Sequence, residues 1–362
     1  KDRVMQAVHQ MGLDPIPEVI SDTTSFGFKK YRSSKDAAEY LFKVLGRKRS
    51  ATKILECDIK GCFDNISHEW LKEKIPMDKK ILEEFMKSGY IFGGEYYKTE
   101  TGTPQGGIIS PTLANITLDG IERILKKKYW TNQKGTIDRQ HNKKKVYLVR
   151  YADDFVITST QEDTLEEIKI IIEKFLKERG LELSQEKTRI VDIEEGFDFL
   201  GWNFRKYKGK LLIKPSKKSE KEIARKLRKV IREMRSSTAE ELIMRLNPII
   251  RGWSNYHRSI CAKKSYQTVD SKVFESLKKW AYRRHQGKSR RKIVEKYWKQ
   301  EGKRNWIFYG GEKKLIRASD TRIIRHNLIK LEANPYLPEY REYYEKREME
   351  NLVKYVKAKL RI

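Results

Sequence analysis

Two adjacent carboxylates stand between two apolar, β-prone runs near the middle of the chain. Asp153 and Asp154 follow Tyr151 and Ala152, and the flanking residues 146–150 and 155–158 are typical of strands. This pattern predicts a hairpin with both acids at its tip. Like charges about 4 Å apart repel by about 4 kcal/mol at an effective dielectric near 20, and a divalent cation removes that cost. An exposed acidic turn is the alternative, because aspartate is common in turns.

A third acid favours the metal interpretation. Asp58 closes another strand candidate, residues 53–59, and the aromatic Phe63 follows across a turn. If the strands are neighbours, Asp58 faces Asp153 and Asp154, and three carboxylates converge as the oxygen ligands that Mg²⁺ prefers. Two Mg²⁺ ions roughly 4 Å apart can activate an attacking 3′-hydroxyl and stabilise a leaving pyrophosphate oxygen.

Helices are expected on either side of these strands. Ser67 is the predicted cap of one helix, and Asp64 before it is either a second cap or a further metal ligand. Ser110 and Pro111 predict the start of another helix, whose apolar spacing continues to Leu125. The mixture of short strands and amphipathic helices over the first two hundred residues predicts an α+β domain.

A further helix is predicted directly after the acidic hairpin. Thr164 and Glu167 have the spacing of a capping box, apolar residues recur on one face, and Gly180 is the expected stop. From about residue 217 the chain becomes basic and helix-prone. Residues 219–235, 239–260 and 266–285 predict a three-helix bundle, and a basic, tyrosine-rich helical tail is expected after an apolar run at 306–309.

The net charge of +29 is concentrated in the second half of the chain. Residues 1–200 hold 34 Lys and Arg against 33 Asp and Glu, whereas residues 201–362 hold 45 against 17. A solubility surface needs only a small net charge of mixed sign, so this asymmetry favours a polyanionic partner such as nucleic acid.

Cysteine content and hydropathy exclude several other classes. The three cysteines lack CxxC spacing, which argues against a disulfide framework and a zinc site and indicates a reducing, intracellular setting. Lys1 to Gln10 lack the apolar core of a signal peptide, and no apolar run reaches eighteen residues. We therefore expect no membrane partner and an intracellular location, either cytoplasmic in a bacterium or archaeon or organellar.

Three motifs resemble those of reverse transcriptases, most closely those encoded within group II introns, which double as splicing maturases. Residues 58–66, Asp-Ile-Lys-Gly-Cys-Phe-Asp-Asn-Ile, resemble the first catalytic motif of that family. Residues 102–111, Gly-Thr-Pro-Gln-Gly-Gly-Ile-Ile-Ser-Pro, resemble its nucleotide-cradling motif, and residues 151–154 its metal box. Further resemblance covers residues 25–33, 180–188, 199–202, 247–256 and 333–336, and so nearly the whole chain.

The resemblance implies roles around the nucleotide. Asp58 and Asp153 would bind both Mg²⁺ ions, with Asp154 in support and the Ile59 carbonyl as a further ligand. Phe63 would be a steric gate that selects deoxynucleotides, although a core aromatic is the alternative. The remaining predicted substrate contacts are Arg32, Gln105 with Gly106 under the base, and Lys187 at the triphosphate. Lys187 could equally be a solvated lysine, and the glycine turn could simply launch the next helix.

Aromatic and basic side chains interleave in the predicted bundle, a pattern suited to stacking on RNA bases and contacting phosphates. The candidate nucleic-acid contacts are Arg251, Trp253, Tyr256, His257, Arg258, Arg283 and Arg284. Trp253 and Trp280 are favoured as bundle core rather than base platforms.

The resemblance implies an α+β right-hand polymerase with an antiparallel sheet, followed by an α-helical thumb and a basic helical extension. Residues 1–210 would form part of the fingers and the palm, 211–304 the thumb or maturase domain, and 305–362 a DNA-binding extension. The expected partners are group II intron RNA, a DNA target or primer, and dNTPs. The alternatives are a splicing cofactor with secondary polymerase activity, a reverse transcriptase of the defence or retron type, and an RNA-directed RNA polymerase.

Overall fold

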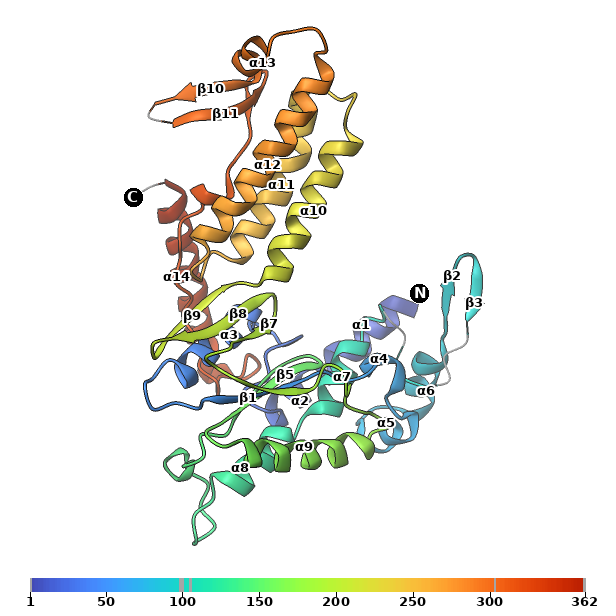
Figure 1. Cartoon of the computed structure of the whole chain (residues 1–362). Coiled ribbons are helices and arrows are strands. Elements are labelled where there is room, and N and C mark those ends of the chain that lie inside the picture. Colours follow the sequence, from blue (N-terminus) through green and yellow to red (C-terminus); the bar gives the residue numbers. More distant parts are fainter. Residues whose placement is uncertain (1, 98–100, 104–105, 303, 361–362) are drawn as a thin grey trace. The chain divides into compact units, whose positions relative to one another are not determined.

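A computed structural model describes residues 2–97, 101–103, 106–302 and 304–360 of the chain (Figure 1). Contacts divide the chain into two compact units. The first comprises Lys1–Phe199, Arg205–Leu211 and His326–Leu352, and the second Leu200–Phe204, Leu212–Arg325 and Val353–Ile362. None of the helices within the described ranges is both long and apolar enough to cross a membrane.

The first unit mixes helices and strands, as predicted. Its helices are α1 (Asp2–Leu13), α2 (Pro15–Ile20), α3 (Ser34–Leu45), α4 (Cys62–Asn65), α5 (His68–Lys74), α6 (Lys79–Lys87), α7 (Ser110–Leu118), α8 (Ile121–Tyr129) and α9 (Glu162–Lys177), with 3₁₀ turns η1 (Arg139–His141) and η3 (Pro338–Tyr340). Its strands are β1 (Lys53–Cys57), β2 (Tyr90–Phe92), β3 (Glu95–Tyr97), β4 (Tyr147–Tyr151), β5 (Asp154–Ser159), β6 (Arg189–Asp192) and β7 (Phe197–Phe199).

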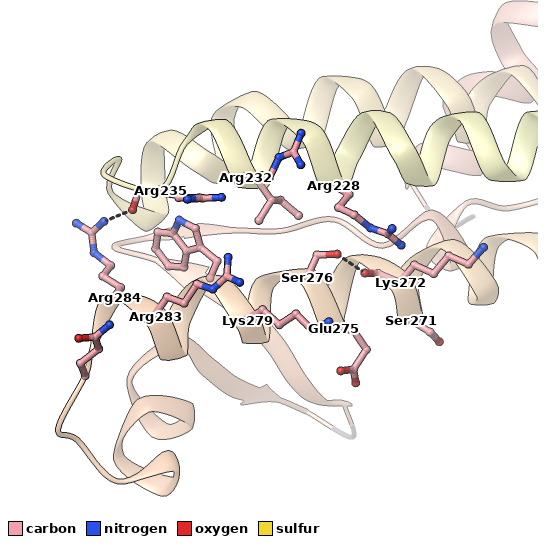
Figure 2. A pocket seen from close by; sticks show the side chains of 13 residues that line it. Arg228, Arg232, Arg235, Ser271, Lys272, Glu275, Ser276, Lys279, Arg283 and Arg284 are labelled. Atoms are coloured by element: carbon pink, nitrogen blue, oxygen red, sulfur yellow. Dashed lines mark hydrogen bonds between the residues drawn. The ribbon is translucent and has the colours of Figure 1, made fainter.

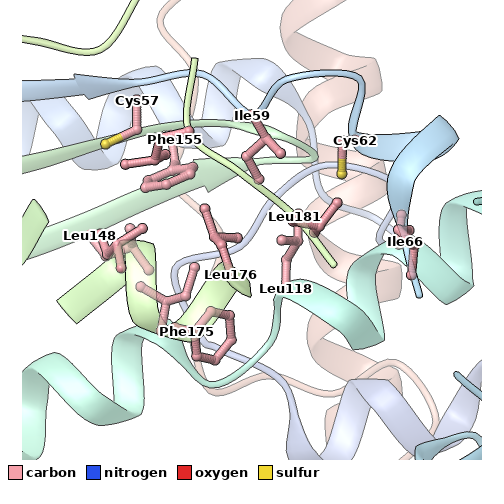
Figure 3. Close-up of a cluster of buried hydrophobic side chains, with 14 of the residues drawn as sticks. Cys57, Ile59, Cys62, Ile66, Leu118, Leu148, Phe155, Phe175, Leu176 and Leu181 are labelled. Carbon is pink, nitrogen blue, oxygen red and sulfur yellow. The ribbon is translucent and has the colours of Figure 1, made fainter. Parts of the chain in front are cut away.

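An antiparallel sheet in the order β4-β5-β1-β6 is the centre of this unit. Helix α9 packs against β1 and β5, and its buried residues are the apolar face that the sequence predicted. Figure 3 shows Leu176 and Phe175 of α9 in one cluster with Phe155 and Leu148 of the sheet. Burying such side chains contributes about 1.5–3 kcal/mol each, so this core fixes the hairpin β4–β5 rigidly on its helix.

Two predicted helices differ from those observed. The helix that begins at Ser110 ends at Leu118, because Asp119 is extended and Gly120 takes a φ of 109°, and α8 then begins at Ile121. Helix α9 begins at Glu162, before the predicted start. Thr164 lies buried inside the first turn, where acidic side chains stabilise the helix dipole, so the predicted capping box is wrong.

The second unit contains the predicted three-helix bundle (Figure 1). Its helices are α10 (Lys217–Glu233), α11 (Ala239–Tyr256), α12 (Lys263–Arg284) and α13 (Arg290–Tyr297), with the turn η2 (Ala318–Asp320) and strands β10 (Trp298–Glu301), β11 (Arg304–Gly310) and β12 (Lys313–Lys314). Ser216 caps α10, and Thr238 with Glu241 forms a capping box on α11. The capped starts follow from hydroxyl and carboxylate side chains that bind free backbone N–H groups.

Three further elements are divided between the units. Strands β8 (Trp202–Tyr207) and β9 (Lys210–Pro215) form a sheet in the order β7-β8-β9. Helix α14 (Arg341–Leu360) is the predicted basic, tyrosine-rich tail.

Candidate active site and nucleic-acid surface

The strand register places Asp58 beside the acidic hairpin tip. Cys57, the last residue of β1, pairs with Phe155 of β5, so Asp58 and Asp154 are the next residues on two neighbouring strands. The tip itself is tight, because Tyr151 pairs with Asp154 and only two residues lie between them. The predicted hairpin is therefore confirmed, and the register brings the backbone of Asp58 to the same end of the sheet as the adjacent Asp153 and Asp154.

The backbone beyond β1 is held in place by the segment after α9. Ser184 N donates to the carbonyl of Asp58 at 2.8 Å, and Lys60 N donates to the carbonyl of Glu182 at 3.0 Å. Ile59 lies between these two bonds and forms an isolated bridge with Leu183. Its carbonyl is used by neither bond, so it remains a candidate metal ligand.

Lys187 contacts one of these acids directly. Its Nζ donates to Asp58 Oδ2 at 3.0 Å, and this bond raises the pKa of Lys187, with further contributions from the charges of Asp58, Asp154 and Asp153. Lys187 thus lies in the combined field of all three carboxylates. Within the described ranges, no three His, Cys, Asp or Glu side chains are arranged to hold a metal ion, so the predicted ligand set stays a prediction.

A buried arginine supports the hairpin tip from beneath. Arg150, on β4, is 0% exposed, and its guanidinium forms an ion pair with Asp119. One terminal nitrogen also donates to Asn115 Oδ1 at 3.1 Å and to the carbonyl of Ala152 at 3.3 Å. Ala152 has a φ of 57°, a left-handed conformation that costs a non-glycine residue roughly 1–2 kcal/mol. We infer that Arg150 holds this strained turn in shape.

A glycine lets another segment approach the same turn. A Cβ on Gly27 would lie 2.3 Å from the nitrogen of Ala152, too close for any side chain. The carbonyl of Gly27 accepts from Asn115 Nδ2 at 2.9 Å, and Phe26 N donates to the carbonyl of Arg150. Gly27 lies within the motif of residues 25–33, but neither it nor Arg150 was among the predicted site residues. The signal that was available is an arginine next to the metal box inside an apolar strand.

The loop that contains Gly102 passes close to the backbone of Phe63. The ring of Phe63 is half-buried, packs against the core and meets Phe28 edge to face at 6.4 Å. A Cβ on Gly102 would lie 2.2 Å from the carbonyl of Phe63, so this glycine is required for the loop to pass. The partly exposed ring is compatible with a gate, which stays a prediction. Gly106 has a φ of 88°, and Gln105 lies outside the described residues.

Arg32 has a structural role in the fold. Its terminal nitrogens donate to the carbonyls of Thr23, Ser25 and Leu331, at 2.6, 3.2 and 2.7 Å. The guanidinium thus ties the segment before α3 to the one before α14. Arg32 is only partly buried, and its predicted substrate contact stays a prediction.

His257 is a correction to the predicted nucleic-acid contacts. It is 1% exposed, and its Nδ1 accepts from Trp202 Nε1 at 2.8 Å. Because an indole N–H can only donate, the proton of the neutral ring is on Nε2, which faces Ser219 Oγ at 3.1 Å. Burial lowers the pKa of His257 to about 4. The ring is therefore a neutral part of the bundle core.

The neighbours of His257 divide between core and surface. Trp253 donates its indole N–H to Ser219 Oγ at 3.0 Å, in line with the favoured core role. Tyr256 stacks on Trp202 with centroids 4.9 Å apart, and its hydroxyl donates to the carbonyl of Leu200. Arg258 contacts Asn255 and the ring of Tyr355, whereas Arg251 is exposed. Arg251 and the partly stacked Tyr256 are the exposed side chains among these neighbours.

A cavity of about 790 Å³ lined by cations lies between α10 and α12 (Figure 2). We call it the basic groove, and its cations are Arg228, Arg232, Arg235, Lys272, Lys279, Arg283 and Arg284. Arg284 donates to the carbonyls of Arg235 and Ser237, and Trp280 forms part of the lining. The lining includes one acid, Glu275, and in the described part of the chain no carboxylate lies within 4 Å of these seven cations. Such uncompensated charge favours an anionic ligand.

Two family models match the chain. Residues 1–204 match the family described as reverse transcriptase (RNA-dependent DNA polymerase), and residues 220–298 match the group II intron, maturase-specific domain. The group II intron-encoded protein LtrA of Lactococcus lactis subsp. cremoris is 30% identical over an alignment of 262 residues that covers 56% of this chain and 43% of that protein. Protein YkfC of Escherichia coli is 32% identical over an alignment of 232 residues that covers 56% of this chain and 60% of YkfC.

Among solved structures, apo telomerase from Candida tropicalis matches with a TM-score of 0.43 and 15% identity, over 76% of this chain and 47% of that one. The chain spans about half the length of the curated relatives it matches. Because the polymerase family model covers more than half of the 362 residues, the chain belongs to the reverse transcriptase family and carries the group II intron maturase-specific domain.

Proposed function

We propose that the chain is the polymerase and maturase portion of a group II intron-encoded protein, an RNA-directed DNA polymerase that also binds its intron RNA. The observation that carries the polymerase assignment is the register that brings Asp58 next to Asp153 and Asp154. Residues 1–210 would be partial fingers and palm, 211–304 the thumb, and 305–362 a DNA-binding extension. The substrates would be dNTPs, an RNA template and a DNA primer.

The donor set suits magnesium. Carboxylates of Asp58, Asp153 and Asp154 with the carbonyl of Ile59 are hard oxygen ligands, and the ion pair of Lys187 with Asp58 supports a cation at this position. Two bound Mg²⁺ ions would supply activation of the primer 3′-hydroxyl and stabilisation of the leaving pyrophosphate. Lys187 would then be displaced from Asp58 and free to reach the triphosphate. Phe63 would exclude a 2′-hydroxyl from the sugar position.

Primer extension with Mg²⁺ tests the polymerase assignment. Asp153→Ala should abolish dNTP incorporation, since loss of a ligand removes the metal. Asp192→Asn is the matched control, because Asp192 lies on β6 of the same sheet but opposite Lys53, at the far end of β1. Incorporation that survives Asp153→Ala would refute the metal assignment. Phe63→Ala should in addition admit ribonucleotides, and a wild-type preference for ribonucleotides would favour an RNA polymerase.

The basic groove carries the second part of the proposal, the binding of intron RNA. Seven cations face one cavity with a single acid among them, and phosphate contacts of this kind dominate nucleic-acid affinity. Because each neutralised phosphate releases counterions, binding should weaken steeply as salt rises. The maturase role then rests on the second unit rather than on the carboxylates.

Charge reversal separates the two roles. Arg228→Glu with Lys279→Glu should lower RNA affinity and intron splicing, and should also reduce the salt dependence of binding. Arg291→Glu is the control, since Arg291 is exposed outside the groove and pairs with Glu295. If the double reversal leaves splicing and RNA affinity unchanged, the maturase assignment fails while the polymerase assignment stands. Asp153→Ala should leave splicing intact.

A further inference from the structure

A second cavity of the helical unit, about 720 Å³, has aromatic walls. It is lined by α12, by strands β10 and β11 and by the segment that follows them. Phe274 stands between two tryptophans, with its centroid 5.7 Å from Trp298 and 6.1 Å from Trp306, both edge to face. We call the cavity bounded by Phe274, Tyr282, Trp298 and Trp306 the aromatic recess. Its volume lies within the range of ligand sites.

The backbone at Trp306 is strained in a way that brings this ring to the surface. Trp306 has a φ of 66°, a conformation that is an outlier for a bulky residue, and its side chain is 57% exposed. The β10–β11 register shifts here, from Lys299 opposite Ile307 to Glu301 opposite Arg304, so β11 contains one extra residue. Bulges of this kind re-aim side chains at functional sites. A glycine would adopt this backbone conformation without strain, so the presence of a tryptophan here indicates a role for its indole ring.

Cations accompany the aromatic rings. The ammonium of Lys278 lies 5.9 Å from the centroid of Phe274, and the lining also includes the acid Glu275 and Arg317, whose guanidinium pairs with Asp320 at 3.2 Å. The carboxylate of Asp270 is directed to the backbone N–H groups of Ala318 and Ser319, at 2.8 and 3.0 Å. Aromatic faces beside cations are the pattern that binds bases of single-stranded nucleic acid.

The aromatic recess adjoins the basic groove. Ser271 and Glu275 of α12 line both cavities, so the two lie on neighbouring faces of one helix. We propose that the aromatic recess binds one unpaired nucleobase of an RNA strand whose phosphates lie in the basic groove, with the base stacked on Trp306. The proposal rests on the proposed RNA binding and adds a site for a base to a surface for phosphates.

Paired oligonucleotides test this site in the whole chain. Fluorescence anisotropy would compare a labelled oligoadenylate of about 12 nucleotides with an abasic oligomer of the same length and charge. Wild type should bind the oligoadenylate more tightly, because stacking of one base is worth roughly 5- to 150-fold in affinity. Trp306→Gly should remove most of that difference and leave binding of the abasic oligomer unchanged. Trp306→Phe should restore most of it.

Trp306→Gly relieves backbone strain as it removes the ring, so a melting temperature at or above that of wild type would show that the fold is intact. Tyr207→Ala is the control, because it removes an exposed aromatic ring that is distant from Trp306 in the sequence. This variant should keep the wild-type ratio of affinities for the two oligomers. The proposal is overturned if Trp306→Gly keeps that ratio. It is also overturned if wild type forms a dimer in a concentration-dependent way and Trp306→Gly abolishes that dimer, because Trp306 would then bind a second copy of the chain. Failure of wild type to bind even the abasic oligomer would instead overturn the proposed RNA binding.

Discussion

Replacement of Arg150 by methionine should damage both the stability of the first unit and its catalytic hairpin. Arg150 is 0% exposed, and the side chain of its partner Asp119 is only 7% exposed. Removing one member of a buried ion pair leaves the other charge unpaired, which costs about 3–5 kcal/mol. Against a total stability of about 5–15 kcal/mol for a domain, this is a large fraction. Urea unfolding followed by circular dichroism measures the loss.

A double variant separates stability from positioning. Arg150→Met with Asp119→Leu removes both charges, and similar replacements of buried pairs are often neutral. Its unfolding free energy should return to within about 1 kcal/mol of wild type. Primer extension should stay impaired, because the carbonyl of Ala152 still lacks its donor. Full activity in the double variant, or wild-type stability in Arg150→Met, would refute this account of the hairpin.

Three further outcomes follow from single contacts. Burial lowers the pKa of His257 from 6.5 to about 4. The neutral ring therefore contributes its full share to the free energy of unfolding above pH 6.5, and this share is lost as pH falls from 6.5 to 4. Comparing wild type with His257→Asn by urea unfolding at pH 7.5 and 4 should show about 3 kcal/mol more acid destabilisation in wild type. Gly27→Ala should reduce primer extension at least about tenfold, because the new Cβ displaces the hairpin tip. Gly12→Ala, in an open position of a helix, should instead raise the free energy of unfolding by about 0.5–1 kcal/mol. Lys187→Met should lower the Mg²⁺ concentration for half-maximal activity, because a competing cation leaves Asp58; an unchanged or higher value would contradict that role.

The sequence predicted those features whose signals are local. The acidic hairpin, the strand before Asp58 and the three bundle helices have periodic apolar residues and caps, so their positions were predicted to within a few residues. The break after Leu118 was not predicted, because the apolar spacing continues across it. The cause is tertiary: Asp119 leaves the helix to pair with Arg150.

Contacts between distant segments could not be predicted from the sequence. The hydrogen bond of Arg32 to the carbonyl of Leu331 joins residues 299 positions apart, so a cation expected at the substrate also holds the fold together. His257 is similar, since an aromatic and basic run does not reveal which rings face inward. Trp202, whose indole binds that histidine, lies more than fifty residues away.

Asp58 and Asp153 are proposed to bind the same metal ions. Titration with Mn²⁺, followed by electron paramagnetic resonance of the free ion, would count and rank the bound ions directly. Asp58→Asn and Asp153→Asn should each remove the tightest Mn²⁺ binding, and the double variant should lose no more than either single one, because the ligands act as a unit. Asp192→Asn should bind as wild type does. Mn²⁺ binding that persists in either single variant, or losses that add up independently in the double variant, would contradict the claim.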